Sequence, residues 1–159
     1  MNNKNLSSLL NLVLIMLSAI GAIFYFLIVP ILGSDLARRN PAYAGAFWPW
    51  LILIWITGAA YYYVLYQGHI IFKEIGQDNS FSKTNTDALR RISRCALITS
   101  ILFFGGNIIY MLLGLNHISL FLLSLAVTAL GITLTVFASS LSQLVIKARE
   151  LKEANDLTI

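Results

Sequence analysis

The sequence is poor in charge, because only 11% of its residues are Asp, Glu, Lys or Arg. Soluble domains carry about 25%. The few charges are also unevenly placed, since four long apolar blocks contain almost none of them. A bilayer core about 30 Å thick requires roughly 20 apolar residues for each helical span. The sequence therefore predicts an all-α integral membrane protein with four spans and no sizeable soluble domain.

Residues that carry chemistry are equally scarce. A single cysteine, Cys95, excludes an intramolecular disulfide. His69 and His117 are expected on opposite sides of the membrane, which argues against a metal site. There is no Gly-rich phosphate loop, no acid or His placed to activate a serine, and no charge in the middle of a span to mark an ion pathway. The sequence predicts a non-enzymatic protein without metal or cofactor.

The four apolar blocks define the expected organisation of one membrane domain. The predicted spans cover about 7–32, 47–72, 93–115 and 119–146, joined by an outer loop, 33–46, and a cytoplasmic connector, 73–92, and followed by a cytoplasmic tail, 147–159. Pro30 is expected to end or kink the first span, because proline lacks a backbone N–H. Together the spans are expected to form a four-helix transmembrane bundle.

The basic residues lie mostly on one side of the predicted membrane. Nine of the eleven Lys and Arg residues precede the first span, separate the second from the third, or follow the fourth; only Arg38 and Arg39 lie in the outer loop. The positive-inside rule then places both termini and the connector in the cytoplasm. The basic residues that give the net charge of +4 lie where membrane insertion and anionic lipid headgroups would place them. Direct nucleic-acid binding is therefore not indicated.

Small and polar residues recur at steps of three, four or seven within three of the spans. Such spacing places them on one helix face, where small residues allow close approach and polar groups need partners. We expect a compact bundle in which Asn107 bonds to Thr128 or Tyr25, and the pattern leaves open whether the seam also encloses a small polar cavity. The predicted polar seam is Asn11, Ser18, Tyr25, Ser100, Asn107, Thr128, Thr135 and Ser142.

Tyr62, Tyr66, His69 and Lys73 step by four, three and four along the second span. They share one face that descends to the cytoplasmic surface. Because histidine titrates near neutral pH, Tyr62, Tyr66 and His69 are candidates for a pH-responsive patch. An interfacial aromatic belt with a snorkelling lysine explains the same pattern, and both interpretations stay open.

The segment 78–94, DNSFSKTNTDALRRISR, is polar although the chain around it is apolar. Thr84 is predicted to cap a helix that runs directly into the third span. Arg90 and Arg91 would lie among lipid phosphates at the inner surface. The tail is predicted to continue the last helix and to lose helical structure near Asn155.

The block FSKTNTDALRRIS, the four-span plan with a short last hairpin, and the tail ARELKEANDLTI resemble the YoaS-like family of bacterial membrane proteins of unknown function. The resemblance covers most of the chain and implies a place in the bacterial cytoplasmic (inner) membrane. Family tails often carry an acid where this chain has Ala154. Members are often encoded beside a small helix-turn-helix regulator, which implies such a regulator as a cytoplasmic partner. The resemblance rests on Phe81, Ser82, Asn85, Leu89, Arg90, Arg91, Ile92, Glu150, Leu151, Asn155, Asp156, Leu157, Thr158 and Ile159.

The leading hypothesis is an interaction protein of the inner membrane that binds or sequesters a cytoplasmic partner such as this regulator. An alternative is a membrane protein of antimicrobial-peptide immunity or export, working through the outer loop. A third hypothesis is a subunit of a larger membrane complex; lipid is a partner in every case, and the oligomeric state stays open. The predicted partner-binding surface comprises Phe81, Ser82, Asn85, Leu89, Arg90, Arg91, Glu150, Leu151, Asn155, Asp156 and Leu157.

Overall fold

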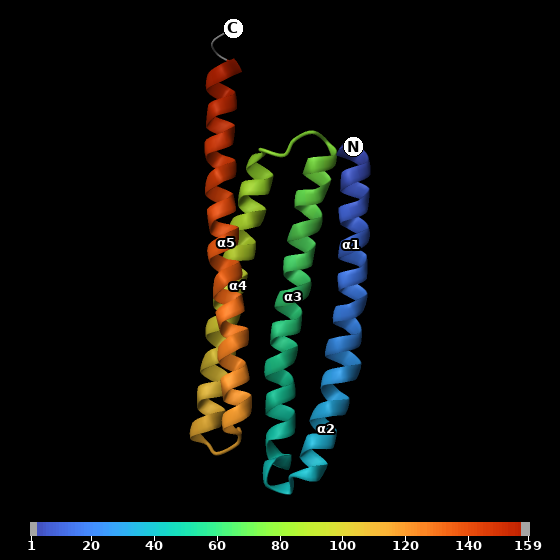
Figure 1. Ribbon diagram of the computed structural model, residues 1–159, viewed down its shortest axis with the longest axis vertical. Coiled ribbons are helices and arrows are strands. Elements are labelled where there is room, and N and C mark those ends of the chain that lie inside the picture. Colours follow the sequence, from blue (N-terminus) through green and yellow to red (C-terminus); the bar gives the residue numbers. More distant parts are fainter. Residues whose placement is uncertain (1–2, 157–159) are drawn as a thin grey trace.

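The computed structural model describes residues 3–156 as a series of helices (Figure 1). The first rod comprises α1 (Asn3–Ile23), a π-helix η1 (Phe24–Ile28) and α2 (Val29–Arg39). A 3₁₀-helix η2 (Pro41–Ala46) leads into α3 (Phe47–Gly76), which is followed by α4 (Lys83–Leu112) and α5 (Ile118–Asp156). Leu157 lies outside the described residues.

Four helical stretches are long and apolar enough to cross a membrane: Asn5–Arg39, Pro41–Gly76, Lys83–Leu112 and Ile118–Asn155. Their mean hydropathies run from 1.3 to 2.8 over the best 18-residue windows. The predicted all-α class with four membrane-spanning helices is therefore confirmed.

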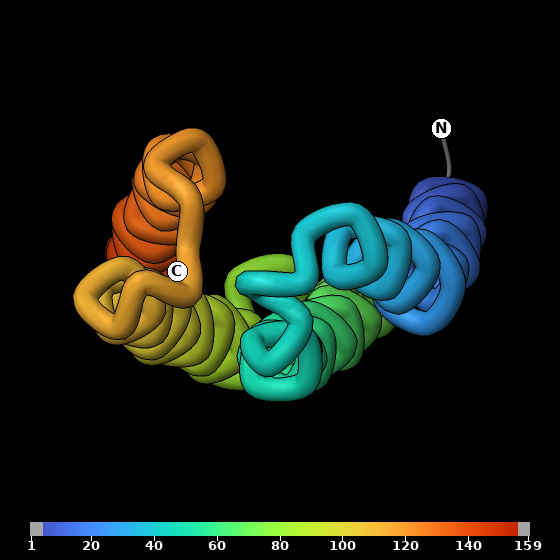
Figure 2. The backbone as a smooth tube through the Cα atoms, turned by 90° about the horizontal axis from the view of Figure 1, so that it is seen from below, coloured from blue at the N-terminus to red at the C-terminus, as the bar shows by residue number. Residues whose placement is uncertain are grey.

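The helices are arranged in sequence order as an open arc. α1 packs against α3, α3 against α4, and α4 against α5. Within residues 3–156 no backbone contact joins α1 to α4 or α5, or α3 to α5, and Figure 2 shows the resulting curve in end view. The compact packing that the seams predicted is thus wrong, although four helices do associate. Each face of small residues packs against one neighbouring helix. Because lipid is as apolar as the helix surfaces, closing the arc would bring no further hydrophobic stabilisation.

One end of the arc carries the first residue of α1, the α3–α4 connection and the last residue of α5 (Figure 1). We call it the termini end. The opposite end, here the turn end, carries α2, η2 and the short α4–α5 connection (Figure 1). The basic residues outside α2 therefore lie toward one end of the molecule, as the topology prediction requires.

Pro30 does not end the first span. The chain widens into the π-helix η1, where the N–H of Val29 bonds to the carbonyl of Phe24, and then continues as α2 to Arg39. A wide turn accommodates the missing N–H of proline and the bulk of its ring. Residues 33–39, expected in a loop, are consequently helical, and the outer connection is reduced to Asn40 and the short η2.

The two ends of α4 are closed by local hydrogen bonds. Ser82 is the N-cap, and its Oγ accepts the N–H of Asn85 at 3.1 Å. Thr84, the predicted cap, lies inside the helix instead. At the other end Gly114 has φ +68°, and its N–H and that of Leu115 bond back to the last turn at 3.1 and 2.8 Å. This Schellman geometry suits glycine and folds the chain directly toward α5.

Candidate binding sites

The α4–α5 interface is built from the predicted seam. Ser93 Oγ donates to the carbonyl of Thr135 at 3.0 Å, and Ser142 Oγ donates to that of Thr86 at 3.3 Å. Other seam hydroxyls donate to backbone carbonyls of their own helices at 2.7–2.9 Å: Ser100 to Ala96, Thr128 to Ser124 and Thr135 to Gly131. Ser and Thr commonly satisfy themselves in this way, so most of the seam serves packing.

Asn107 is buried and hydrogen-bonded, but to a different partner from those predicted. Its Oδ1 accepts Asn116 Nδ2 at 3.1 Å, and its Nδ2 donates to the carbonyl of Phe103 at 2.8 Å. The Thr128 hydroxyl donates to a carbonyl of its own helix, α5, and the Tyr25 ring packs over Gly58 on α3. The expectation failed because the αL turn at Gly114 brings Asn116 back over the end of α4.

The other seam joins α1 to α3 and meets the predicted tyrosine–histidine patch there. Tyr62 donates its hydroxyl to the carbonyl of Ser18 at 3.0 Å, and His69 Nδ1 lies 2.8 Å from Asn11 Oδ1. These four residues and Tyr66 line a groove of about 320 Å³ whose remaining walls are Leu14, Ile15 and Leu65. The seam and the patch are thus two sides of one groove.

At the termini end, the predicted partner-binding residues divide into two groups. Ser82 and Asn85 are buried, and they are used within the chain: Ser82 caps α4, and Asn85 Nδ2 donates to the carbonyl of Ser80 at 2.9 Å. Phe81, Arg90 and Arg91 are exposed, while Leu89 is half-buried. Only the second group therefore offers side chains to a partner.

The last helix extends well beyond its neighbour. Ser142 pairs with Thr86 in the first turn of α4, so about three turns of α5 continue past that helix, as the projecting end in Figure 1 shows. Leu151 is 73% exposed there, and Glu150 and Asn155 are exposed as well. Asp156 is the last residue of α5.

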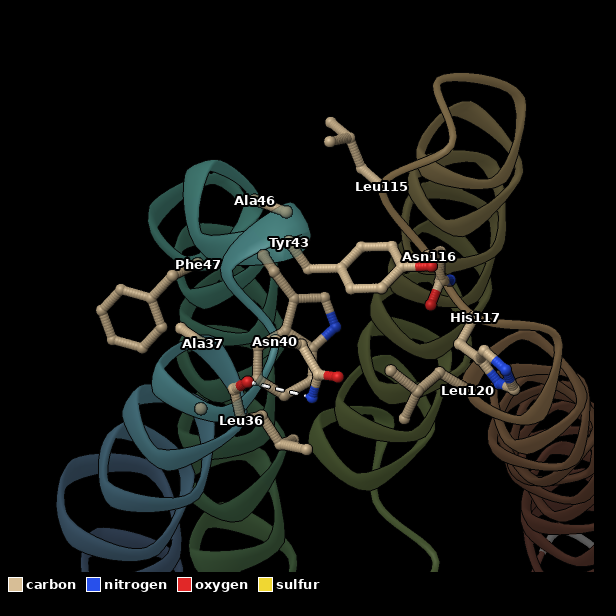
Figure 3. A pocket seen from close by; sticks show the side chains of 12 residues that line it. Leu36, Ala37, Asn40, Tyr43, Ala46, Phe47, Leu115, Asn116, His117 and Leu120 are labelled. Carbon is tan, nitrogen blue, oxygen red and sulfur yellow. Dashed lines mark hydrogen bonds between the residues drawn. The ribbon is translucent and has the colours of Figure 1, made fainter.

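A pocket of about 350 Å³ lies at the turn end, between η2 and the α4–α5 connection. Figure 3 shows Tyr43 and Asn116 pointing toward one another from its two sides. Asn40 is held by a 3.2 Å bond from its Nδ2 to the carbonyl of Leu36. The lining residues are Gly33, Leu36, Ala37, Asn40, Tyr43, Ala46, Phe47, Trp50, Leu115, Asn116, His117 and Leu120.

Sequence reasoning did not identify this pocket. Its residues come from two stretches of chain that are far apart in the sequence, 33–50 and 115–120, and their meeting depends on α2 continuing past Pro30 and on the tight turn at Gly114. Buried Gln67 was also missed: it is 1% exposed, and its Oε1 has no hydrogen-bond partner among the described residues. Gln67 follows Leu53 by two heptads, so it shares the face of α3 on which Leu53 contacts Gly106 of α4.

The side chains at these sites indicate what kind of molecule they could bind. Among the described residues, no group of three or more His, Cys, Asp or Glu side chains is placed to hold a metal ion. The pocket at the turn end and the groove between α1 and α3 have mainly apolar, amide and aromatic side chains in their walls, together with one histidine each. Their chemistry suits noncovalent binding rather than bond making.

Comparison with known proteins supports the membrane assignment. A family described as Protein of unknown function (DUF2975) matches residues 31–159. A relative in Bacillus subtilis (strain 168), described as "Uncharacterized membrane protein YoaS", is 26% identical over 134 residues, which are 83% of this chain and 84% of the relative. No solved structure matches the chain significantly. The predicted YoaS-like resemblance and the location in a bacterial membrane are confirmed, and nothing in these matches indicates catalysis.

Proposed function

The chain belongs to the DUF2975 family, and we propose that it is a non-enzymatic protein of the bacterial inner membrane whose cytoplasmic end binds a soluble protein. In this proposal the termini end faces the cytoplasm, because nine of the eleven basic residues lie toward it. The partner is proposed to be a small helix-turn-helix regulator, which the protein holds at the membrane.

The observation that supports this proposal is the exposed extension of α5. Leu144, Ala148, Leu151 and Asn155 step by four, three and four, so they share one face of the helix. Leu144 and Leu151 are 60% and 73% exposed. An amphipathic helix with anchors at this spacing is suited to the apolar groove of a partner protein.

The charges of the extension favour a protein partner over the lipid surface. Lys147, Arg149 and Lys152 alternate with Glu150 and Glu153, and Arg149 Nε lies 3.1 Å from Glu153 Oε1. A helix that lies on an anionic membrane usually carries an excess of basic residues on its polar face. Such an excess is present instead near the start of α4, at Arg90, Arg91 and Arg94, where lipid phosphates are proposed to bind.

A membrane-recruitment assay tests the proposal. A helix-turn-helix regulator of the kind proposed is expressed as a fluorescent fusion together with the full chain. We expect it to move to the membrane, to be released by Leu151→Asp, and to stay bound with Lys152→Asp, which adds an acid on another side of the same exposed turn. A regulator that remains cytoplasmic with the wild-type chain, or equal retention by both variants, would contradict the proposal.

A further inference from the structure

The pocket at the turn end lies between two parts of the protein that pack together elsewhere only through α3 and α4. Its walls come from α2, η2 and the start of α3 on one side and from the α4–α5 connection on the other. No backbone contact joins α2 or η2 to α4 or α5 within the described chain. Side chains such as Tyr43 and Asn116 approach across the space between them (Figure 3).

The chemistry of the lining limits what can bind. None of the 12 lining residues is Asp, Glu, Lys or Arg. The walls are largely apolar and aromatic, and hydrogen-bonding groups are limited to Asn40, Tyr43, Trp50, Asn116 and His117. Moving a charge into such a place is costly, so the lining favours an apolar body with an uncharged, hydrogen-bonding head.

Size and position point to the same class of molecule. The volume of about 350 Å³ lies at the lower end of the range of roughly 300–1,000 Å³ for small-molecule pockets. That is room for one short chain or ring. Trp48 and Trp50 also mark this end of α3 as the membrane–water boundary, where an amphiphile has its head in water and its chain in lipid.

Contacts within the chain hold the walls in place. A Cβ on Gly33 would lie 2.9 Å from Phe47 Cε2, so α2 and α3 approach closely only because residue 33 is glycine. Asn116 is fixed by Asn107 at 3.1 Å, and His117 Nδ1 accepts the N–H of Ser119 at 3.3 Å in the first turn of α5. A preformed pocket avoids the entropy cost of ordering its walls on binding.

We propose that this pocket binds a single apolar chain of an amphiphile without net charge and thereby bridges the two halves of the arc. The binding groups are the apolar walls for the chain and the Asn40 and His117 side chains, both exposed and on opposite halves, for the head. The same chemistry is available from a chain of a membrane lipid or from a free amphiphile, and the experiment separates these two sources.

The full chain is reconstituted in phosphatidylcholine vesicles and photolabelled with a diazirine derivative of octanol or with phosphatidylcholine that carries a diazirine in one chain. Labelled peptides are mapped by mass spectrometry. Ala37→Phe fills the pocket from α2, and Leu120→Trp fills it from α5. Ala44→Phe is the matched control, since Ala44 is exposed and does not line the pocket. Circular dichroism confirms that each variant is folded.

We expect one of the two probes to label 36–50 and 115–120 together, and an excess of octanol to protect both segments. Labelling should fall about tenfold in each filled variant and persist in the control. Labelling by the octanol probe identifies a free amphiphile, and labelling by the lipid probe identifies a bilayer chain. Labelling that octanol does not reduce, or that is equal in Ala37→Phe and Ala44→Phe, would overturn the proposal.

Discussion

The indole N–H of Trp55 donates a hydrogen bond to the backbone carbonyl of Tyr25, 3.1 Å away on the neighbouring helix. In an α-helix that carbonyl would accept the N–H of Val29, but in η1 this N–H bonds to Phe24 instead. The next residue is Pro30, which has no N–H to offer. Trp55 therefore replaces a donor that the first helix lacks, as a backbone carbonyl within a membrane span requires.

Trp55→Phe should destabilise the protein by about 0.6–1.7 kcal/mol, the range measured for such bonds between membrane helices. The phenyl ring keeps the aromatic contact with Phe26, so the loss reports the hydrogen bond. In a Pro30→Ala background the cost should be smaller, because residue 30 then supplies an N–H or allows a regular α-helix. Unfolding in detergent micelles measures the cycle, and an equal cost in both backgrounds would disprove the compensation.

Gly131→Ala should weaken the α4–α5 pair, because the new Cβ would collide with Ser100 Oγ and lie 3.3 Å from Ser100 Cβ. We expect a loss of about 1–3 kcal/mol, as for other overpacked interfaces. Gly105→Ala is the control, since nothing lies within 4 Å of a Cβ there. Thermal unfolding of both variants tests the difference, and adding Ser100→Gly should restore part of the loss.

Ser82→Ala should remove the cap of α4 at a cost of about 0.5–2 kcal/mol. Ser82→Thr should retain most of the cap, and Ser80→Ala should be nearly neutral because Asn85 bonds only to the backbone carbonyl of Ser80. Hydrogen exchange in the first turn of α4 is the measurement. Unchanged protection in Ser82→Ala would show that this cap contributes little.

The orientation can be read from the labelling of introduced cysteines. In a Cys95→Ser background, Ala42→Cys should react with an impermeant maleimide added to intact cells, because η2 would face outward. Gln77→Cys should react only after the membrane is opened. Both positions are exposed. The reverse pattern would invert the assignment and would remove the cytoplasmic partner from the proposed function.

Long apolar blocks made the four helices predictable, because a bilayer demands about 20 such residues per span wherever they occur. The seam was also predictable: Ser142, one of its residues, bonds to the carbonyl of Thr86 on the neighbouring helix α4. The order in which the helices pack against one another could not be predicted from the sequence. Small residues indicate that a face will pack closely, but they do not say which of three other helices will fill it.

Local backbone geometry explains the remaining differences. Pro30 predicts a break in the first helix. Only the π-helix in the structure shows that a wide turn accommodates the proline instead. Both Ser82 and Thr84 are chemically capable caps, and the choice depends on where the connection from α3 delivers the chain. Asn116 belongs to no span, so its bond to Asn107 could not be predicted from helical spacing.

The division of the polar bonds between neighbouring helices has a consequence for biosynthesis. The cross-helix bonds of Ser7, Trp55, Tyr61, Tyr62 and His69 stay within α1–α3, and those of Ser93 and Ser142 stay within α4–α5. Between α3 and α4 lies the weak 3.9 Å contact of Cys95 Sγ with the carbonyl of Ala60. Each hairpin thus carries most of its polar partners with it into the bilayer, although the buried Gln67 Oε1 has no hydrogen-bond partner among the described residues. Two separately translated fragments, cut between Gln77 and Ser82, should insert independently and reassemble into the complete protein.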